Sequence, residues 1–238
     1  MSAAALRALH VPGKPLVLPN AWDAGSARLV AEAGFPAIAT TSSGVAEALG
    51  HADHEQAPVT EVLAVVARIV RAVELPVTAD MESGYGLAPA ELAAALADAG
   101  AVGLNYEDTD HAGFPALRAT AEQAERIAAV KAAGDLVLNA RIDTHIRGRS
   151  AEEGLERARA YLDAGADCVY PIGIRDPALI ERYVALGGAV NVLLTPDQLP
   201  VKHLKELGVA RISLGGHLYD DAMDFVRERL LSLRDTRS

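Results

Sequence analysis

Four carboxylates stand out in this sequence because they lie at the ends of two short apolar runs. They are Asp80 and Glu82 in one segment and Glu107 and Asp108 in another. If the runs form neighbouring parallel strands, these like charges come close together and cannot all stay ionised without a counter-charge. A hard divalent cation supplies one, and Mg²⁺ normally takes only one or two carboxylates. We therefore predict a Mg²⁺ site at Asp80 and Glu107, with Mn²⁺ as an alternative ion.

Glu82 and Asp108 are the weaker candidates for direct metal ligands. Successive side chains of a strand point to opposite faces, so the side chains of these two residues can point away from the site. We retain Glu82 as a third predicted ligand. For all four acids, the alternative is a structural role in which they cap neighbouring helices or pair with Arg141.

Arg141 is the basic residue among the polar side chains expected at the strand ends. A guanidinium group can grip a carboxylate or a phosphoryl group with two parallel hydrogen bonds. Ser43 and Gly44 add a hydroxyl and unhindered backbone amides, which suit a second anion contact. These residues predict an anionic substrate, and the alternative for Arg141 is a structural ion pair with Glu107.

Several further polar or aromatic residues are candidates for the same site. Tyr85 and His111 are predicted catalytic residues, since the first can hydrogen-bond a substrate oxygen and the second lies on a loop that can cover the pocket. Trp22 and Asn191 are predicted substrate contacts at two other strand ends, although Trp22 also suits a core anchor. His54 belongs to a His-Ala-Asp-His run, but that spacing matches no compact metal site.

The elements that must position these residues alternate between short apolar runs and Ala-rich amphipathic stretches. The expected strands are Leu16–Pro19, Ala37–Thr41, Val77–Asp80, Val102–Tyr106, Leu136–Ala140, Cys168–Ile172, Val190–Leu193 and Ile212–Leu214. The expected helices are Ala24–Ala33, Val59–Val73, Pro89–Ala99, Ala121–Ala133, Ser150–Ala164, Pro177–Leu186, Pro200–Leu207 and His217–Ser232. Eight such repeats predict an α/β protein with a (β/α)8 TIM barrel, whose active site lies at the C-terminal ends of the strands. An open doubly wound sheet is the alternative, but no Gly-x-Gly-x-x-Gly follows the first strand.

The bulk composition narrows the class of protein. The 238 residues suit one barrel domain spanning 1–238, and 50% of them are hydrophobic. The net charge of −10 argues against nucleic acid or an anionic membrane as a partner. No apolar run is long enough for a membrane span, and we find no signal peptide. A single cysteine, Cys168, excludes an intrachain disulfide, so we expect a cytoplasmic protein.

Motifs at these strand ends resemble those of the isocitrate lyase/phosphoenolpyruvate mutase superfamily. The resemblance covers nearly the whole chain and is closest to short bacterial proteins named after phosphoenolpyruvate phosphonomutase or carboxyvinyl-carboxyphosphonate phosphorylmutase. The motifs are Pro19-Asn20-Ala21-Trp22-Asp23, Thr41-Ser42-Ser43-Gly44 with Leu49-Gly50 and Asp53, Ala79-Asp80-Met81-Glu82-Ser83-Gly84-Tyr85-Gly86, Tyr106-Glu107-Asp108, Asn139-Ala140-Arg141 and Ser213-Leu214-Gly215.

The resemblance implies a metal site of known kind. Asp80 and Glu107 match family acids around Mg²⁺, and Glu82 stands where the family usually has Asp. Asp53 matches an acid on a mobile loop that closes over the site, and we count it among the predicted catalytic residues.

The resemblance also implies the chemistry. Ser43, Gly44 and Arg141 match groups that hold the carboxylate of a 2-oxo acid. Family members make or break C–C or P–C bonds beside such an acid or its enolate. We therefore predict a Mg²⁺-dependent enzyme that cleaves a C–C bond of a small 2-oxo dicarboxylate through a metal-bound enolate, as a lyase or decarboxylase.

One segment departs from the family pattern. Lyases of the family carry a Lys-Lys-Cys-Gly-His loop, and phosphonomutases a loop with Lys and Asn, where this chain has Thr109–Arg118 without lysine or cysteine. Cys168 lies within an expected strand and suits the core. We therefore do not expect isocitrate or methylisocitrate cleavage. The alternatives are a phosphonopyruvate-type P–C hydrolase or phosphomutase, and a 2-oxo acid binding protein with little turnover. We also expect a homo-oligomer, either a dimer or a tetramer.

Overall fold

The computed structural model describes residues 1–235, so the last three residues of the expected domain, 236–238, lie outside it. The segment around Pro19 closes the main sheet of the protein into a barrel. Strand β1 (Leu16–Leu18) pairs in parallel with β11 (Arg211–Ser213), and β2 (Asn20–Ala21) pairs in parallel with β3 (Ile38–Thr40). Because Pro19 has no backbone N–H to donate, the ladder switches partners there. The two short strands are therefore halves of one barrel strand.

The remaining strands complete the ring. They are β4 (Val77–Asp80), β5 (Gly103–Glu107), β8 (Val137–Ile142), β9 (Cys168–Pro171) and β10 (Ala189–Leu193). All pairings within this sheet are parallel, in the order β1-β11-β10-β9-β8-β5-β4-β3-β2. With β1 and β2 counted as one strand, the predicted (β/α)8 TIM barrel is confirmed.

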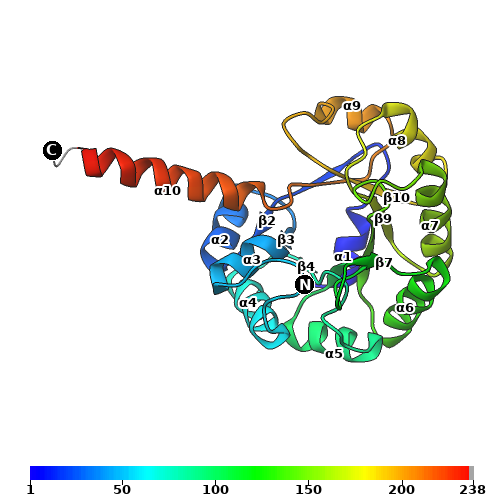
Figure 1. The fold of residues 1–238 in the computed structure, drawn as a ribbon, viewed down its shortest axis with the longest axis horizontal. Coiled ribbons are helices and arrows are strands. Elements are labelled where there is room, and N and C mark those ends of the chain that lie inside the picture. The colour runs from blue at the N-terminus through cyan, green and yellow to red at the C-terminus, as the bar shows by residue number, and fades with distance from the viewer. Residues whose placement is uncertain (236–238) are drawn as a thin grey trace.

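Helices surround the strands as expected (Figure 1). The helices that follow the barrel strands are α2 (Ala24–Glu32), α4 (Val59–Ala72), α5 (Pro89–Ala99), α6 (Thr120–Ala133), α7 (Ala151–Asp163), α8 (Pro177–Val184), α9 (Val201–Glu206) and α10 (His217–Asp235). Their apolar faces bury side chains such as Ile69, Leu92 and Ile127 against the outside of the sheet. Within residues 1–235, no helix combines the length and apolar character needed to cross a membrane.

A short helix, α1 (Ala3–Ala8), covers the N-terminal end of the barrel and was not predicted from the sequence. Its Leu6 is fully buried and belongs to a cluster with Leu18 and Val137. Leu6 also lies against Gly103, the first residue of β5. Figure 1 shows α1 inside the ring of outer helices. With the N-terminal end covered in this way, the C-terminal end is left for the functional site.

Two further elements at the C-terminal end were also not predicted. Helix α3 (Ser42–Leu49) begins directly after β3, and the side chain of Thr41 caps it. The antiparallel strands β6 (Thr109–Asp110) and β7 (Ala116–Leu117) form a hairpin within the segment predicted to be a lid. Both elements place short polar segments over the ends of the barrel strands.

The last helix, α10, leaves the barrel and projects from it along most of its length (Figure 1). Its first turns contact the barrel, and Tyr219 is buried there. Beyond them, apolar side chains such as Phe225 and Leu230 are exposed. An amphipathic helix normally buries its apolar residues, so α10 presents an unusual apolar surface.

Candidate active site

A cavity of about 160 Å³ opens at the C-terminal ends of the barrel strands. Its walls come from nearly every strand of the barrel, which is where (β/α)8 enzymes carry their active sites. The residues that line it are Asn20, Thr41, Ser42, Ser43, Asp53, Asp80, Asn105, Arg141, Tyr170, Ile172, Leu193, Ser213, Gly215 and Gly216. Four residues predicted for the site, namely Ser43, Asp53, Asp80 and Arg141, are therefore brought together. We call this the strand-end cavity.

Asp53 and Asp80 bring two carboxylates to the strand-end cavity. Burial raises the pKa of Asp80, Arg141 opposes that shift, and Asp53 adds to it. The backbone N–H groups of Ser42 and Glu82 donate to the Asp80 carboxylate and hold it in place. The Oδ1 atom of Asp53 is buried and has no hydrogen-bond partner. The buried Asp80 carboxylate and the unsatisfied Asp53 oxygen are a donor set that fits a hard divalent cation such as Mg²⁺ or Mn²⁺.

Arg141 supplies positive charge to the same cavity. Its Nη1 lies 2.7 Å from Oε2 of Glu107, and its Nε donates to Oδ1 of Asp143 at 2.7 Å. Burial lowers the pKa of Arg141, but Glu107, Asp143 and Asp80 outweigh burial and raise the pKa well above its usual value. The guanidinium therefore stays charged and is held by two carboxylates while it lines the cavity.

Glu107 lies beside the cavity rather than in its wall, and it forms a pair with His111. The Nε2 atom of His111 lies 2.5 Å from Oε1 of Glu107. Burial raises the pKa of Glu107 to about 7, and both Arg141 and His111 moderate this rise. Burial lowers the pKa of His111, but the hydrogen bond to Glu107 outweighs it and gives a net increase. A proton shared by these two groups is therefore available near neutral pH.

Glu82 is not among the residues that line the strand-end cavity, and its side chain pairs with Tyr85. The Tyr85 hydroxyl donates to Oε1 of Glu82 at 2.6 Å, and the backbone N–H of Glu55 donates to Oε2 at 3.0 Å. Burial raises the pKa of Glu82 to about 8. Both Glu82 and Tyr85 adopt positive φ, at 46° and 52°. This left-handed backbone explains why sequence parity could not assign the direction of the Glu82 side chain.

Glu55 holds this turn in place and was missed by the sequence analysis. Its Oε1 accepts from the backbone N–H of Ser83 at 3.0 Å, from the Ser83 hydroxyl at 2.8 Å and from the backbone N–H of Tyr85 at 2.7 Å. The segment that carries Asp53 is thereby fastened to the turn that follows β4. No sequence signal marked Glu55, because its contacts depend on tertiary structure.

Ser43 is the part of the Ser43-Gly44 pair that reaches the cavity. Its hydroxyl lies 3.1 Å from that of Thr41, and a Cβ atom at Gly216 would lie only 2.8 Å from the Ser43 oxygen. The loop before α10 can approach Ser43 this closely only because Gly216 has no side chain. Gly44 instead packs inside α3 against Tyr219, and its backbone N–H donates to Thr41.

Trp22 and Asn191 are not among the residues that line the strand-end cavity. Trp22 packs edge-on against Tyr219, with ring centroids 5.3 Å apart, beside an apolar hollow between α2 and α10. Asn191 is fully buried, and its amide donates to the Ser213 hydroxyl at 3.0 Å. Asn191 therefore supports Ser213, which does line the cavity.

Asp108 points to the opposite side of β5 from the site. It is fully buried, and its Oδ2 accepts from Tyr161 at 2.9 Å and from Arg157 at 3.1 Å. Its Oδ1 accepts from the backbone N–H of Asp143 at 2.9 Å. This network ties β5 and β8 to α7. The sequence signal for this difference was the alternation of side chains along a strand, which directs the neighbouring Asp108 and Glu107 to opposite faces.

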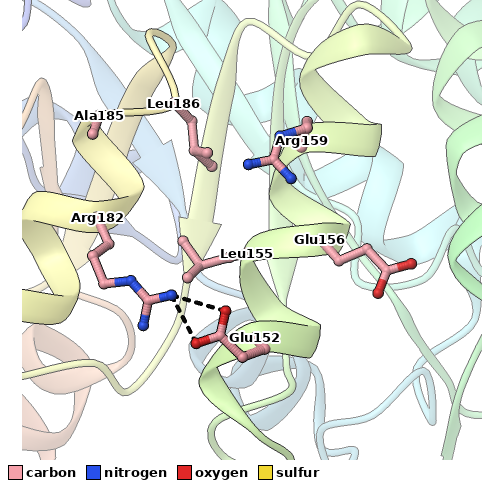
Figure 2. Close-up of a pocket in the computed structure, with 7 residues that line it drawn as sticks. All are labelled: Glu152, Leu155, Glu156, Arg159, Arg182, Ala185 and Leu186. Carbon is pink, nitrogen blue, oxygen red and sulfur yellow. Dashed lines mark hydrogen bonds and ion pairs between the residues drawn. The ribbon is translucent and has the colours of Figure 1, made fainter.

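A roomier hollow of about 540 Å³ lies on the outside of the barrel between α7 and α8. Figure 2 shows the ion pair of Arg182 with Glu152 in this hollow. Nη2 of Arg182 lies 2.7 Å from Oε1 of Glu152. Both side chains are largely solvent-exposed. No strand end contributes to it, so the smaller strand-end cavity is the better candidate for chemistry.

Comparison with known proteins shows which proteins this chain is similar to. A solved structure of a phosphonomutase-type protein from Burkholderia cenocepacia J2315 is 43% identical, with a TM-score of 0.88 that covers 96% of this chain and 98% of that one. Oxaloacetate decarboxylase from Ectopseudomonas mendocina is 31% identical over 90% of this chain and 77% of its own length. A phosphonopyruvate hydrolase, solved with oxalate and Mg²⁺, is 27% identical, with a TM-score of 0.87 that covers 100% of this chain and 89% of that one.

The match to a family model is the broadest finding. The model described as phosphoenolpyruvate phosphomutase matches residues 6–234, which include every strand and every site residue described above. The superfamily suggested by the strand-end motifs is therefore confirmed. This chain belongs to the phosphoenolpyruvate phosphomutase family, within the phosphoenolpyruvate mutase/isocitrate lyase superfamily.

Proposed function

We propose that this protein is a Mg²⁺-dependent enzyme that cleaves a C–C bond of a small 2-oxo acid, as a lyase or decarboxylase. The observation that carries the proposal is the convergence of Asp53, Asp80 and Arg141 on one strand-end cavity. Its volume of about 160 Å³ suits a ligand of only a few non-hydrogen atoms. Carboxylates for a cation and a guanidinium for an anion lie side by side there, as a chelating 2-oxo acid requires.

The cation site of this proposal consists of Asp80 and Asp53, with Glu107 nearby. Mg²⁺ bound there would polarise the carbonyl oxygen of the substrate and offset the negative charge that develops on it. A bound cation would offset the cost of burying the charged Asp80 carboxylate and would give the buried Oδ1 atom of Asp53 a partner. Both effects favour occupancy of this site.

Three groups of the chain itself bind and orient the substrate. Arg141 grips the carboxylate with its planar guanidinium. The Ser43 hydroxyl lies at the beginning of α3, where the helix dipole favours negative charge. When the C–C bond breaks, one fragment leaves without the bonding electrons, as CO2 in a decarboxylation, and the electron pair moves toward the carbonyl and forms an enolate. Ser43 and α3 stabilise that charge where it develops.

Proton transfer is assigned to groups beside the cavity. The His111–Glu107 pair holds a proton near neutral pH and can deliver it to the enolate carbon. Tyr85, which is hydrogen-bonded to Glu82, is a second candidate donor. His111 lies in the Thr109–Arg118 segment, which has neither the lysine nor the cysteine that the family resemblance leads us to expect there, so this chain requires another acid/base group.

Two relatives support the substrate class. One is named oxaloacetate decarboxylase, and another binds oxalate and Mg²⁺ as a phosphonopyruvate hydrolase. Hydrolysis of a P–C bond is therefore the second candidate reaction, and 2-oxo acid binding without turnover is the third. All three use the same cation and carboxylate contacts, so only product analysis separates them.

The test compares products from two substrates. Wild-type protein with Mg²⁺ is incubated with oxaloacetate, and pyruvate formation is measured against the rate with Mg²⁺ alone. Parallel samples with phosphonopyruvate are assayed for released phosphate. Pyruvate above the metal-only rate supports the lyase proposal, phosphate release supports the hydrolase, and saturable oxalate binding without either product supports the binding protein.

A matched pair of variants tests the cation site. Asp80→Asn removes a carboxylate from the cavity, whereas Asp98→Asn removes one from the exposed surface of α5. We expect Asp80→Asn to lower Mg²⁺ affinity and turnover by about 100-fold or more, and Asp98→Asn to leave both unchanged. Full Mg²⁺ and oxalate affinity in Asp80→Asn would overturn the proposal.

We also propose that the protein is a homo-oligomer. The exposed apolar side chains of α10, including Phe225, Leu230 and Leu231, support association with a second copy. Light scattering of the wild type should give a mass at least twice that of one chain. Phe225→Glu with Leu230→Glu should shift the mass toward the monomer, and an unchanged assembly would contradict a role for α10.

A further inference from the structure

His54, Glu82 and His111 form a cluster that the mechanism above does not use as a unit. We propose that these three residues form a second metal site, selective for a borderline ion such as Zn²⁺, Co²⁺ or Ni²⁺, which fastens the 109–118 hairpin to the barrel mouth. The proposal does not depend on the 2-oxo acid activity. It concerns ligands different from Asp53 and Asp80.

The geometry of the cluster is compact. One potential ligand atom from each of the three residues lies within 4.8 Å of the others. The rings of His54 and His111 stack, with centroids 4.9 Å apart and planes at 22°. The imidazole ring of His111 lies beside Glu82, since its Nε2 atom, which also contacts Glu107, is 4.0 Å from Oε2 of Glu82. Zn²⁺ binds nitrogen at about 2.0–2.1 Å, so a modest inward movement of these side chains would complete the contacts.

His111 provides an independent sign that a ligand belongs here. Its side chain is only 3% exposed, and its Nδ1 atom is buried without a hydrogen-bond partner. Nε2 lies 2.5 Å from Oε1 of Glu107, and with the ring proton on Nε2 the Nδ1 atom keeps a free lone pair. A carboxylate that orients the imidazole through its other nitrogen is the usual support of a metal-binding histidine.

The chemistry of the ligands separates this cluster from the strand-end cavity. Two imidazoles and one carboxylate match the three-ligand sites of Zn²⁺ and related ions, which keep a fourth position for water. Imidazole is a poor ligand for Mg²⁺, which prefers oxygen. The carboxylates of Asp53 and Asp80 suit the hard ion instead. The chain therefore offers two neighbouring sites with opposite metal preferences.

The three ligands come from three separate segments of the chain. His54 lies in the loop between α3 and α4, Glu82 in the turn after β4, and His111 directly after β6 in the hairpin. A bound ion would cross-link all three segments over the end of the barrel. We expect it to hold the hairpin closed and to raise the stability of the folded protein.

The test uses Co²⁺ as a spectroscopic probe, with the full chain and saturating Mg²⁺. Wild-type protein should bind one equivalent of Co²⁺ with visible absorption bands typical of a four-coordinate site. His54→Ala and His111→Ala should each weaken Co²⁺ binding by at least about tenfold. His51→Ala is the matched control, because His51 lies in the same loop but outside the cluster. Zn²⁺ should raise the Tm of wild type and His51→Ala but not of His54→Ala.

Each result bears directly on the proposal. Wild-type Co²⁺ affinity in His54→Ala, or equal losses in His54→Ala and His51→Ala, would overturn it. His54 is exposed, so its substitution keeps the test valid even if His111→Ala folds poorly. Asp80→Asn should lose Mg²⁺ binding and retain Co²⁺ binding. If Asp80→Asn instead loses Co²⁺ binding, the ion occupies the strand-end cavity and no second site exists.

Discussion

Arg141 and Glu107 are direct neighbours across the parallel pair β5 and β8, and their side chains form an ion pair of 2.7 Å at the mouth of the barrel. The same guanidinium lines the strand-end cavity. Glu107 in turn contacts His111 through its other oxygen. The group proposed to bind the substrate is thus connected through one carboxylate to the group proposed to move a proton.

The first prediction follows from the shape of the Arg141 guanidinium. Arg141→Lys keeps the charge but loses the planar fork that contacts Glu107 and Asp143 while facing the cavity. We expect oxalate affinity in the presence of Mg²⁺ to fall by about 10-fold to 100-fold, measured by calorimetry. Arg159→Lys, on the exposed surface of α7, is the control and should bind oxalate like wild type. Unchanged affinity in Arg141→Lys would remove Arg141 from the substrate site.

The second prediction concerns the buried network around Asp108. Asp108→Ala removes the buried acidic partner of Arg157, which keeps only the half-buried Glu153, and also removes the acceptor of the Tyr161 hydroxyl. Breaking a buried pair in this way costs about 3–5 kcal/mol of the free energy of unfolding, measured by urea denaturation.

A matched control for Asp108 is the exposed pair of Glu152 with Arg182 (Figure 2). Glu152→Ala should cost less than about 1 kcal/mol, since water screens exposed pairs. Similar costs for Asp108→Ala and Glu152→Ala would show that the Asp108 network does not stabilise the fold.

The third prediction tests the close packing at the N-terminal end of the barrel. A Cβ atom at Gly103 would lie 2.7 Å from the backbone oxygen of Val137 and 3.0 Å from Leu6. Because a backbone oxygen in a sheet cannot move aside, Gly103→Ala should lower the free energy of unfolding by about 1–3 kcal/mol. Gly25→Ala in α2 meets only the Asp23 side chain at 3.4 Å and should be neutral or stabilising. Thermal and urea unfolding of the two variants measure the difference.

The fourth prediction is a pH dependence of stability at His10. Burial, with a further contribution from Arg211, lowers the pKa of His10 to about 4 in the folded protein. The unfolded chain has a histidine pKa of about 6.5. Between these values only the unfolded state takes up the proton, so the free energy of unfolding falls as the pH drops from about 6.5 to 4. The loss from this group is at most about 3 kcal/mol.

His10→Gln removes the titrating group and is the variant for this test. Urea denaturation at a series of pH values should give a flatter dependence between pH 4 and 6.5 in His10→Gln than in wild type. His203→Gln, in the last turn of α9, serves as the comparison. Parallel curves for wild type and His10→Gln would exclude His10 as the source of the dependence.

The sequence by itself determined the barrel and the positions where its chemistry lies. Strands buried on both faces read as short apolar runs, and the polar residues after them must meet at one end because all the strands are parallel. That reasoning brought Asp80 and Arg141 to one cavity and turned Asp108 away from Glu107. It could not identify α1 or α3, which are short and depend on packing against the barrel.

Only the tertiary structure decided which polar groups touch. The left-handed backbone at Glu82 and Tyr85 redirects both side chains, and no pattern of residue types predicts that turn. His54 and His111 lie far apart in the chain, yet the fold stacks their rings. The strand periodicity is a local property that can be read along the chain. Contacts between loops depend instead on how the loops close over the barrel, because loop backbones have no repeating geometry that ties residue number to direction.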